Sequence, residues 1–163
     1  MAGVTLTKKS DSIQARNQAM LDRANTMQSF LNRVIFKMYQ DAQRLRWASE
    51  GGSEGYPWEQ LNSKYETWKK KKYQKYDGSG SKLMVATNAL HQSAIENAAK
   101  IATNENITIT VNSDVQNPET KKSVSNYAKY AAHARPIMKF SQDTIDTFRD
   151  AIQTYIATGK DKS

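Results

Sequence analysis

The sequence predicts a helix-rich α+β protein with a long N-terminal helix, a small antiparallel sheet and a C-terminal helix. Residues 10–47 contain neither Gly nor Pro, and their apolar side chains recur at spacings of three and four. Residues 107–111 alternate β-branched apolar residues with threonines, which is the pattern of a strand. Ser141 precedes an acidic turn and an apolar stripe that continues to Ile156, as expected for a capped amphipathic helix.

The N-terminal pattern allows one helix or two. A single helix over residues 10–48 would be about 55 Å long at 1.5 Å per residue, so it would project from a domain of this size or bridge two subunits. A break near Asn25 would instead give two shorter helices. Residues 1–9 show no periodicity and are expected to form a flexible arm, with a flexible tail at 158–163. One domain would then span residues 10–157, with its core in 58–157.

Shorter elements are expected between the two terminal helices. In chain order they are a loop at 51–57, a helix from Pro57 to Tyr76, a linker at 77–81, a helix at 83–99, a hairpin of 101–103 with 107–111, a loop at 112–120 and a helix at 124–132. Arg135-Pro136 ends the last of these helices. The prediction is therefore of many short elements between two longer helices.

Composition excludes several classes of site. The chain has no cysteine, which removes disulfides, thiolate nucleophiles and Cys-ligated metals. His91 and His133 have no carboxylates at metal-ligand spacing, and no phosphate loop or nucleophile motif is present. We therefore expect no catalytic residues, no metal and no cofactor. No run approaches the roughly 20 apolar residues of a membrane span, and the N-terminus lacks a signal-peptide core, so no membrane partner is expected.

The net charge of +8 is concentrated in residues 64–76. This segment has one acidic residue and six lysines: Lys64, Lys69, Lys70, Lys71, Lys72 and Lys75. Four aromatic residues are interleaved with them: Tyr65, Trp68, Tyr73 and Tyr76. Rings that stack on bases beside cations that neutralise phosphates are typical of a groove for single-stranded nucleic acid. The alternative is a helix with its rings in the core and its lysines in solvent. A charged surface here would suit either DNA or an acidic protein rim.

Several short motifs follow one another in a recognisable order over residues 58–157. They are Trp58-x2-Leu61-x3-Tyr65, the segment 82–93 that contains Leu83, Thr87, Asn88 and Leu90, the pair Tyr127-Ala128, and Ala134-Arg135-Pro136 before the closing helix. This order resembles the tailed-phage virion morphogenesis proteins, also called tail-completion proteins. Two positions depart from the family. Asn88 replaces a glycine but tolerates a left-handed backbone, and the loop at 129–133 is short and lacks glycine.

The resemblance implies a non-enzymatic structural protein at the phage neck, where the DNA-filled head meets the tail. Its copies would form a homo-oligomeric ring, for which a hexamer is one candidate, that completes the tail and joins it to the head. Its partners would be head connector or adaptor proteins and tail tube or terminator proteins, with transient contact to phage DNA. It would reside in the virion, and in the host cytoplasm during assembly.

The same resemblance suggests which residues form interfaces. These are Trp58, Leu83, Thr87, Asn88, Leu90, Arg135 and Pro136. The turn at Arg135-Pro136 would aim the guanidinium at a carboxylate of the same or a neighbouring subunit. The alternative function is that of a basic nucleic-acid-binding protein that uses residues 64–76.

Overall fold

The computed structural model describes residues 7–76, 83–131 and 134–161, with side chains described from Ser12 onward. Its elements are α1 (Thr7–Asn25), α2 (Met27–Phe30), a π-helical turn η1 (Leu31–Ile35), α3 (Phe36–Ala48), a 3-10 turn η2 (Gly52–Glu54), α4 (Ser63–Lys72), α5 (Ala89–Ala94), β1 (Ala99–Ala102), β2 (Ile107–Thr110), α6 (Val124–Ala131) and α7 (Gln142–Thr158). The predicted α+β class, with a small antiparallel sheet and a C-terminal helix, is confirmed.

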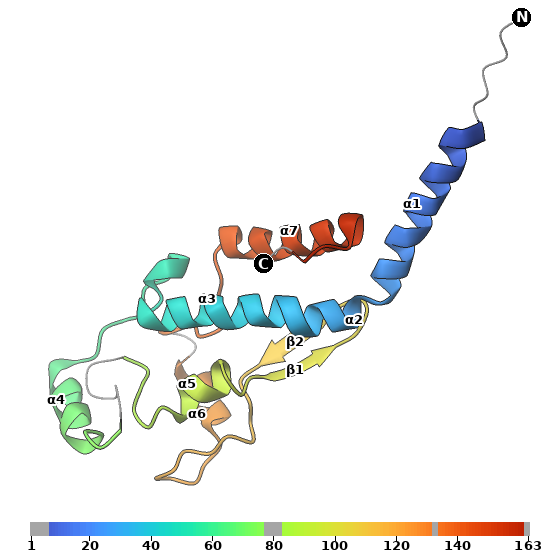
Figure 1. The fold of residues 1–163 in the computed structure, drawn as a ribbon. Helices are drawn as coiled ribbons and strands as arrows, with labels where there is room; N and C mark the ends of the chain where they lie inside the picture. The colour runs from blue at the N-terminus through green and yellow to red at the C-terminus, as the bar shows by residue number, and fades with distance from the viewer. Residues whose placement is uncertain (1–6, 77–82, 132–133, 162–163) are drawn as a thin grey trace, which may run out of the picture.

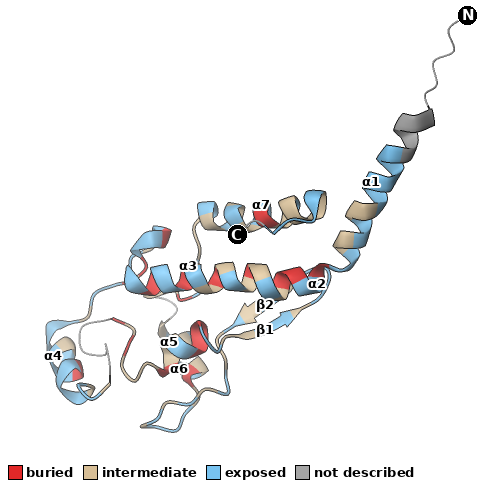
Figure 2. Ribbon diagram, in the orientation of Figure 1, coloured by how far each residue is buried: buried red, intermediate tan, exposed pale blue. Residues whose placement is uncertain are grey.

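A central helical rod organises the fold. α2, η1 and α3 follow one another without a gap, with α7 along one side and the β1–β2 hairpin, α5 and α6 on the other (Figure 1). α1 leaves this rod and points away from the rest of the molecule. Its last turn is tied to α7, because the Arg23 guanidinium donates to the carbonyls of Ile156 and Ala157 at 2.7 and 3.0 Å. Most of the remaining α1 surface is exposed (Figure 2).

The single uninterrupted helix over 10–48 is wrong, and the alternative with a break near Asn25 is correct. Thr26 leaves the helical region at φ −117° and ψ 24°, and its hydroxyl donates to the carbonyl of Asp22 at 2.9 Å. A threonine that bonds back to the preceding turn competes with the helical hydrogen bonds there. The first helix also begins at Thr7, so residues 7–9 are helical; the rest of the expected arm lies outside the described residues.

Two hydrophobic clusters hold the rod in place. One lies where α2 and η1 meet α7, and it contains Met27, Phe30, Leu31, Ile35 and Ala151. The ring of Phe30 stacks on Tyr155 at a centroid distance of 4.2 Å. The other lies beside the end of α3 and contains Trp47, Trp58, Leu83, Val85, Ala94, Ile95 and Ile137. The second cluster therefore brings three segments that are distant in sequence onto the same end of α3.

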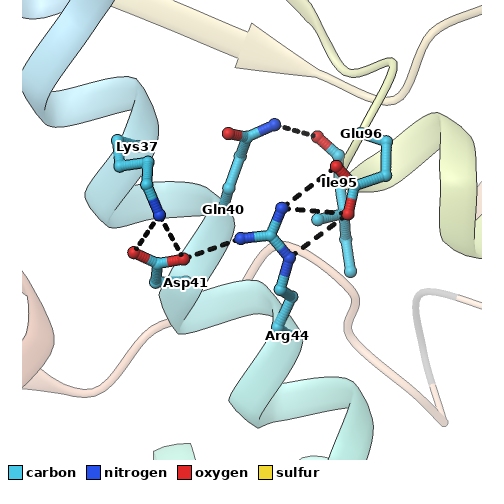
Figure 3. Close-up of polar contacts among 6 residues, drawn as sticks. All are labelled: Lys37, Gln40, Asp41, Arg44, Ile95 and Glu96. Atoms are coloured by element: carbon cyan, nitrogen blue, oxygen red, sulfur yellow. Dashed lines mark hydrogen bonds and ion pairs between the residues drawn. The ribbon is translucent and has the colours of Figure 1, made fainter.

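Polar contacts join the middle of α3 to the turn after α5 (Figure 3). Gln40 donates to the carbonyl of Ile95 at 3.1 Å, and Arg44 forms an ion pair with Glu96 at 3.0 Å. Arg44 also contacts Asp41, to which Lys37 donates from the preceding turn. The exposed ion pairs contribute little stability individually, and the contacts of Gln40 and Arg44 are the ones that join α3 to the turn after α5.

α4 begins later and ends earlier than the predicted helix, since its last residue is Lys72 rather than Tyr76. Residues 57–62 are not helical, and Asn62 caps α4 by accepting from the backbone N–H of Lys64 at 2.9 Å. Trp58 is drawn into the core, where its ring meets Trp47 edge to face at 5.0 Å. Gly51 makes this possible. It has φ +88°, and a Cβ there would lie 2.2 Å from the backbone oxygen of Tyr56. The predicted linker at 77–81 lies outside the described residues.

α5 is also shorter than the predicted helix over 83–99, because Asn88 starts it from a left-handed backbone of φ +62°. The expectation that Asn88 tolerates this conformation is confirmed. The chain then turns into β1, which pairs with β2 from Ala99 opposite Thr110 to Ala102 opposite Ile107. The predicted hairpin is therefore correct, and Ala99, predicted to be helical, lies in β1 instead.

The last two helices agree with prediction. α6 occupies Val124–Ala131, and Ser141 caps α7 by accepting from the backbone N–H of Thr144 at 3.2 Å. The tail expected at 158–163 overlaps α7 at Thr158, the last residue of that helix. Within this tail, Asp161 forms an ion pair with Arg33 at 2.6 Å. Within the described residues, no helix is both long and apolar enough to cross a membrane.

Candidate functional site

Aromatic and basic side chains form a continuous layer over α4 and the turn that follows it. The rings of Tyr65 and Trp68 lie 5.2 Å apart, and Trp68 meets Tyr73 edge to face at 5.9 Å. The Lys72 ammonium lies over both Trp68 and Tyr73, at 4.8 and 5.3 Å from the ring centroids. Tyr65 is 49% exposed and Trp68 46%. We call Tyr65, Trp68, Lys72 and Tyr73 the ring layer.

The predicted exposure of the rings and of Lys69 is partly wrong. The alternative that placed the rings in the core does not hold for Tyr65 and Trp68, which face solvent. Lys69, predicted to belong to an exposed basic patch, is buried instead, at 2% exposed. Its ammonium donates to the carbonyl of Leu83 at 3.0 Å. Burial lowers the pKa of Lys69 to about 8, and the carboxylate of Glu50 opposes that change.

The other five lysines are exposed, but two of them have acidic partners. Lys70 pairs with Glu66 at 2.6 Å, and Lys75 pairs with Glu119 at 2.8 Å. A hydrogen bond from Lys75 holds the pKa of Glu119 below its usual range. Lys64, Lys71 and Lys72 form no ion pair with a described carboxylate. The predicted patch therefore has a smaller charge surplus than six lysines suggest.

A cavity of about 340 Å³ opens between α4, α6 and the segment before α5. Its lining includes Leu61, Tyr65, Lys69, Tyr73, Leu83, Met84, Thr87, Leu90, Val124, Tyr127, Tyr130 and Arg135. Among the described residues that line it, the ionised side chains are Lys69 and Arg135, and none is a carboxylate. The cavity therefore combines apolar walls, four tyrosine side chains and two cations. We call it the α4–α6 pocket.

Among the described residues of this chain, Arg135 contacts backbone carbonyls and forms no ion pair with a carboxylate; its contact with a carboxylate of a neighbouring subunit stays a prediction. Its Nε donates to the carbonyl of Glu59 at 2.8 Å, and an Nη donates to the carbonyl of Gln60 at 3.4 Å. Glu59 in turn donates its backbone N–H to the carbonyl of Ala134 at 3.4 Å. Arg135 thus fastens the segment before α4 to the segment after α6, and its side chain lines the pocket between them.

The structure brings together most of the residues that the motif order singled out. Leu83, Thr87, Leu90 and Arg135 line the α4–α6 pocket, and Lys69 joins them there. Three others lie elsewhere: Trp58 is a core residue, Asn88 sets the turn before α5, and Pro136 lines a smaller cavity beside Ile137.

Some residues of this region were missed by sequence reasoning. Tyr130, which is 86% exposed, lines the pocket, and no local pattern distinguishes it. The buried charged residues Arg46 and Glu54 were missed as well. Arg46 is fully buried and Glu54 is 5% exposed. The available signal for Arg46 is its helical spacing, since it lies seven residues after Tyr39 and therefore on the same face of the helix.

No group of three His, Asp or Glu side chains that could hold a metal ion occurs within residues 7–76, 83–131 and 134–161.

Comparison of the chain with protein-family models, with curated proteins and with solved structures finds no match. The interpretation of the site therefore depends on its own geometry and on the order of its motifs.

Proposed function

We propose that this chain is a non-enzymatic structural protein of a tailed phage. In this proposal it forms an oligomeric ring at the neck, completes the tail and joins it to the DNA-filled head. The observation that carries the proposal is the convergence of its motif residues, because Leu83, Thr87, Leu90 and Arg135 come from two distant segments and line one pocket. The turn at Asn88 supports it too, since its left-handed backbone suits the position at which the family has glycine.

The projecting α1 supports assembly into a ring. An isolated helix of this length is marginally stable in water, and most helices in proteins are stabilised by packing. Beyond its last turn α1 has little packing of its own, and Ile13 and Leu21 are 56% and 57% exposed. A neighbouring copy would bury these side chains. A heterologous contact of this kind, repeated around an axis, closes into a ring.

Imaging of virions assembled without this protein tests the proposal. In lysates of the phage whose gene for this chain is disrupted, negative-stain micrographs should show full heads and finished tails that remain unjoined. Supplying the intact chain from a plasmid should restore joined particles. Tails of uncontrolled length would instead indicate a terminator, and normal infectious particles would overturn the proposal.

A second candidate function is binding of single-stranded nucleic acid, favoured by the ring layer. Stacking of one base on an aromatic side chain contributes about 1–3 kcal/mol, and each phosphate neutralised adds to the salt dependence. Trp68→Ala combined with Lys72→Ser should therefore lower the affinity for a thymidine oligonucleotide about tenfold or more, and flatten its salt slope. The measurement is a fluorescence anisotropy titration at several salt concentrations.

The control for this titration is Lys129→Ser, which removes an exposed cation from α6, outside the ring layer. Its affinity for the oligonucleotide should stay within about twofold of that of the unchanged chain. Equal losses in the two variants would show that only net charge matters. An unchanged affinity in the Trp68 and Lys72 variant would exclude the ring layer as the binding surface.

A further inference from the structure

The α4–α6 pocket has the size and the lining of a binding site. Its volume of about 340 Å³ lies at the lower end of the range for small-ligand sites, which is roughly 300–1,000 Å³. Leu61, Met84, Leu90 and Val124 supply apolar wall. Tyrosine side chains add rings with a polar end, a combination that is enriched where proteins bind other proteins. The pocket is therefore suited to an apolar side chain that carries a polar group beside it.

The positive charge of the pocket lining favours a ligand whose polar group is negatively charged. Lys69 and Arg135 are both on its lining, and both donate to backbone carbonyls, so they are held in place. Glu50 offsets part of this charge, but it accepts from the backbone N–H of Leu83 and does not line the pocket. The carboxylate of Glu66 is engaged by Lys70. A ligand with a carboxylate would therefore meet fixed cations at little cost in side-chain ordering.

We propose that the α4–α6 pocket binds an acidic peptide segment of a partner protein. An apolar side chain of that segment packs against Leu61, Leu90 and Val124, and an adjacent carboxylate approaches Arg135 and Lys69. The proposal deepens the proposed neck function and rests on it for the kind of partner, which is another structural protein of the particle.

The two ends of this chain are poor candidates for the occupant. The N-terminal segment carries Lys8 and Lys9, and the C-terminal segment carries Lys160 and Lys162, so both would bring like charge to the pocket. DNA is disfavoured for a different reason. Its phosphates lie along an outer edge and suit exposed cations, whereas Lys69 is almost fully buried among apolar walls.

The test is an NMR titration of the ¹⁵N-labelled full chain with capped hexapeptides. The probe has the sequence Asp-Asp-Leu-Phe-Asp-Asp; one comparison peptide has Asn for every Asp, and another has Gly-Gly in place of Leu-Phe. We expect the probe to shift the amides of Thr87, Leu90 and Tyr127. The affinity for either comparison peptide should be at least fivefold weaker.

Matched variants assign the contacts. Arg135→Gln and Lys69→Gln should each weaken binding of the probe about fivefold or more. Lys71→Gln, which removes the same charge from α4 outside the pocket, should change it less than twofold. Arg135→Lys loses the guanidinium fork that spans two carbonyls but keeps the positive charge. Because of that charge, it should retain more affinity for the probe than Arg135→Gln. It also keeps the test decisive if Lys69→Gln does not fold.

Three results would overturn the proposal. They are no amide shifts around the pocket at millimolar probe, equal binding of the Asn peptide, and displacement of the probe by a thymidine oligonucleotide that shifts the same amides. Failure of the neck function is distinguishable, since it would appear as normal particles in the disruption experiment while the peptide still bound the purified chain.

Discussion

Replacement of Arg46 by alanine should destabilise the protein by about 3–5 kcal/mol, because two carbonyls lose a buried charged donor, at a cost of about 1–3 kcal/mol each. The Arg46 side chain is fully buried, and its guanidinium donates to the carbonyls of Pro136 and Lys139. Burial lowers its pKa, and the carboxylate of Glu54 opposes that change. Glu54 in turn accepts from the backbone N–H of Ser141 at 2.8 Å.

The cost should be large because Arg46 and Glu54 together fix the chain between Pro136 and the start of α7. Without the guanidinium, two carbonyls lose their donor and the buried carboxylate of Glu54 loses the favourable charge of Arg46. The loss would also release the segment that follows Arg135. Some disturbance of the α4–α6 pocket is therefore expected at temperatures well below the midpoint of unfolding.

Urea unfolding followed by circular dichroism measures this effect, and Arg44→Ala is the matched control. Arg44 lies two residues earlier on α3, forms ion pairs with Asp41 and Glu96, and is exposed (Figure 3). Exposed pairs of this kind contribute little to stability, so this variant should lose much less free energy of unfolding than Arg46→Ala. Equal losses for the two variants would contradict the importance that we assign to the buried network.

The elements that were predicted correctly from sequence are those determined by residues close together in the chain. The hairpin of β1 and β2 follows from alternating β-branched residues around a polar turn, and Ser141 caps α7 because its hydroxyl can accept from the third residue of the helix. Asn88 belongs here too, since its tolerance of positive φ is a property of the residue alone. These elements need no knowledge of what packs against them.

The errors lie where distant segments decide the outcome. Trp58 suits the first turn of a helix, but the pairing of its ring with Trp47 and the turn at Gly51 hold it in an extended segment. The spacing of Tyr65, Trp68 and Lys72 puts these residues on one face of α4, where they lie together. It could not show which face is buried, because the ammonium of Lys69 donates to the carbonyl of Leu83, fourteen residues away. That partner is invisible to helical periodicity.

Raising the pH from 7 to 10.5 should stabilise the unchanged chain relative to a Lys69→Met variant. The folded state lowers the pKa of Lys69 from 10.5 to about 8, so between these values the unfolded chain binds the proton and the folded chain does not. Stability rises with pH wherever the unfolded state binds more protons. Since one pKa unit corresponds to about 1.4 kcal/mol, the relative gain should reach roughly 2–3 kcal/mol.

The measurement is the difference in free energy of unfolding between the two proteins in urea at pH 7, 8.5 and 10. The neighbouring groups that titrate or carry charge near Lys69 are Glu50, Glu66, Arg135 and the tyrosines of the pocket. They are present in both proteins, so their contributions cancel to first order. Lys71→Met supplies the control, because it removes an exposed lysine from the same helix and leaves the buried amine of Lys69 in place.

The same comparison discriminates between two roles for Lys69. A buried ammonium that only satisfies the carbonyl of Leu83 would give the pH-dependent difference with or without a ligand. If the amine also faces the acidic peptide, saturation with the Asp-containing hexapeptide should raise its pKa, because a nearby carboxylate favours the charged form. The rise in relative stability would then begin at higher pH in the presence of the peptide. A difference that is flat across the whole pH range would show that Lys69 is solvated in the folded protein, and would remove it from the pocket.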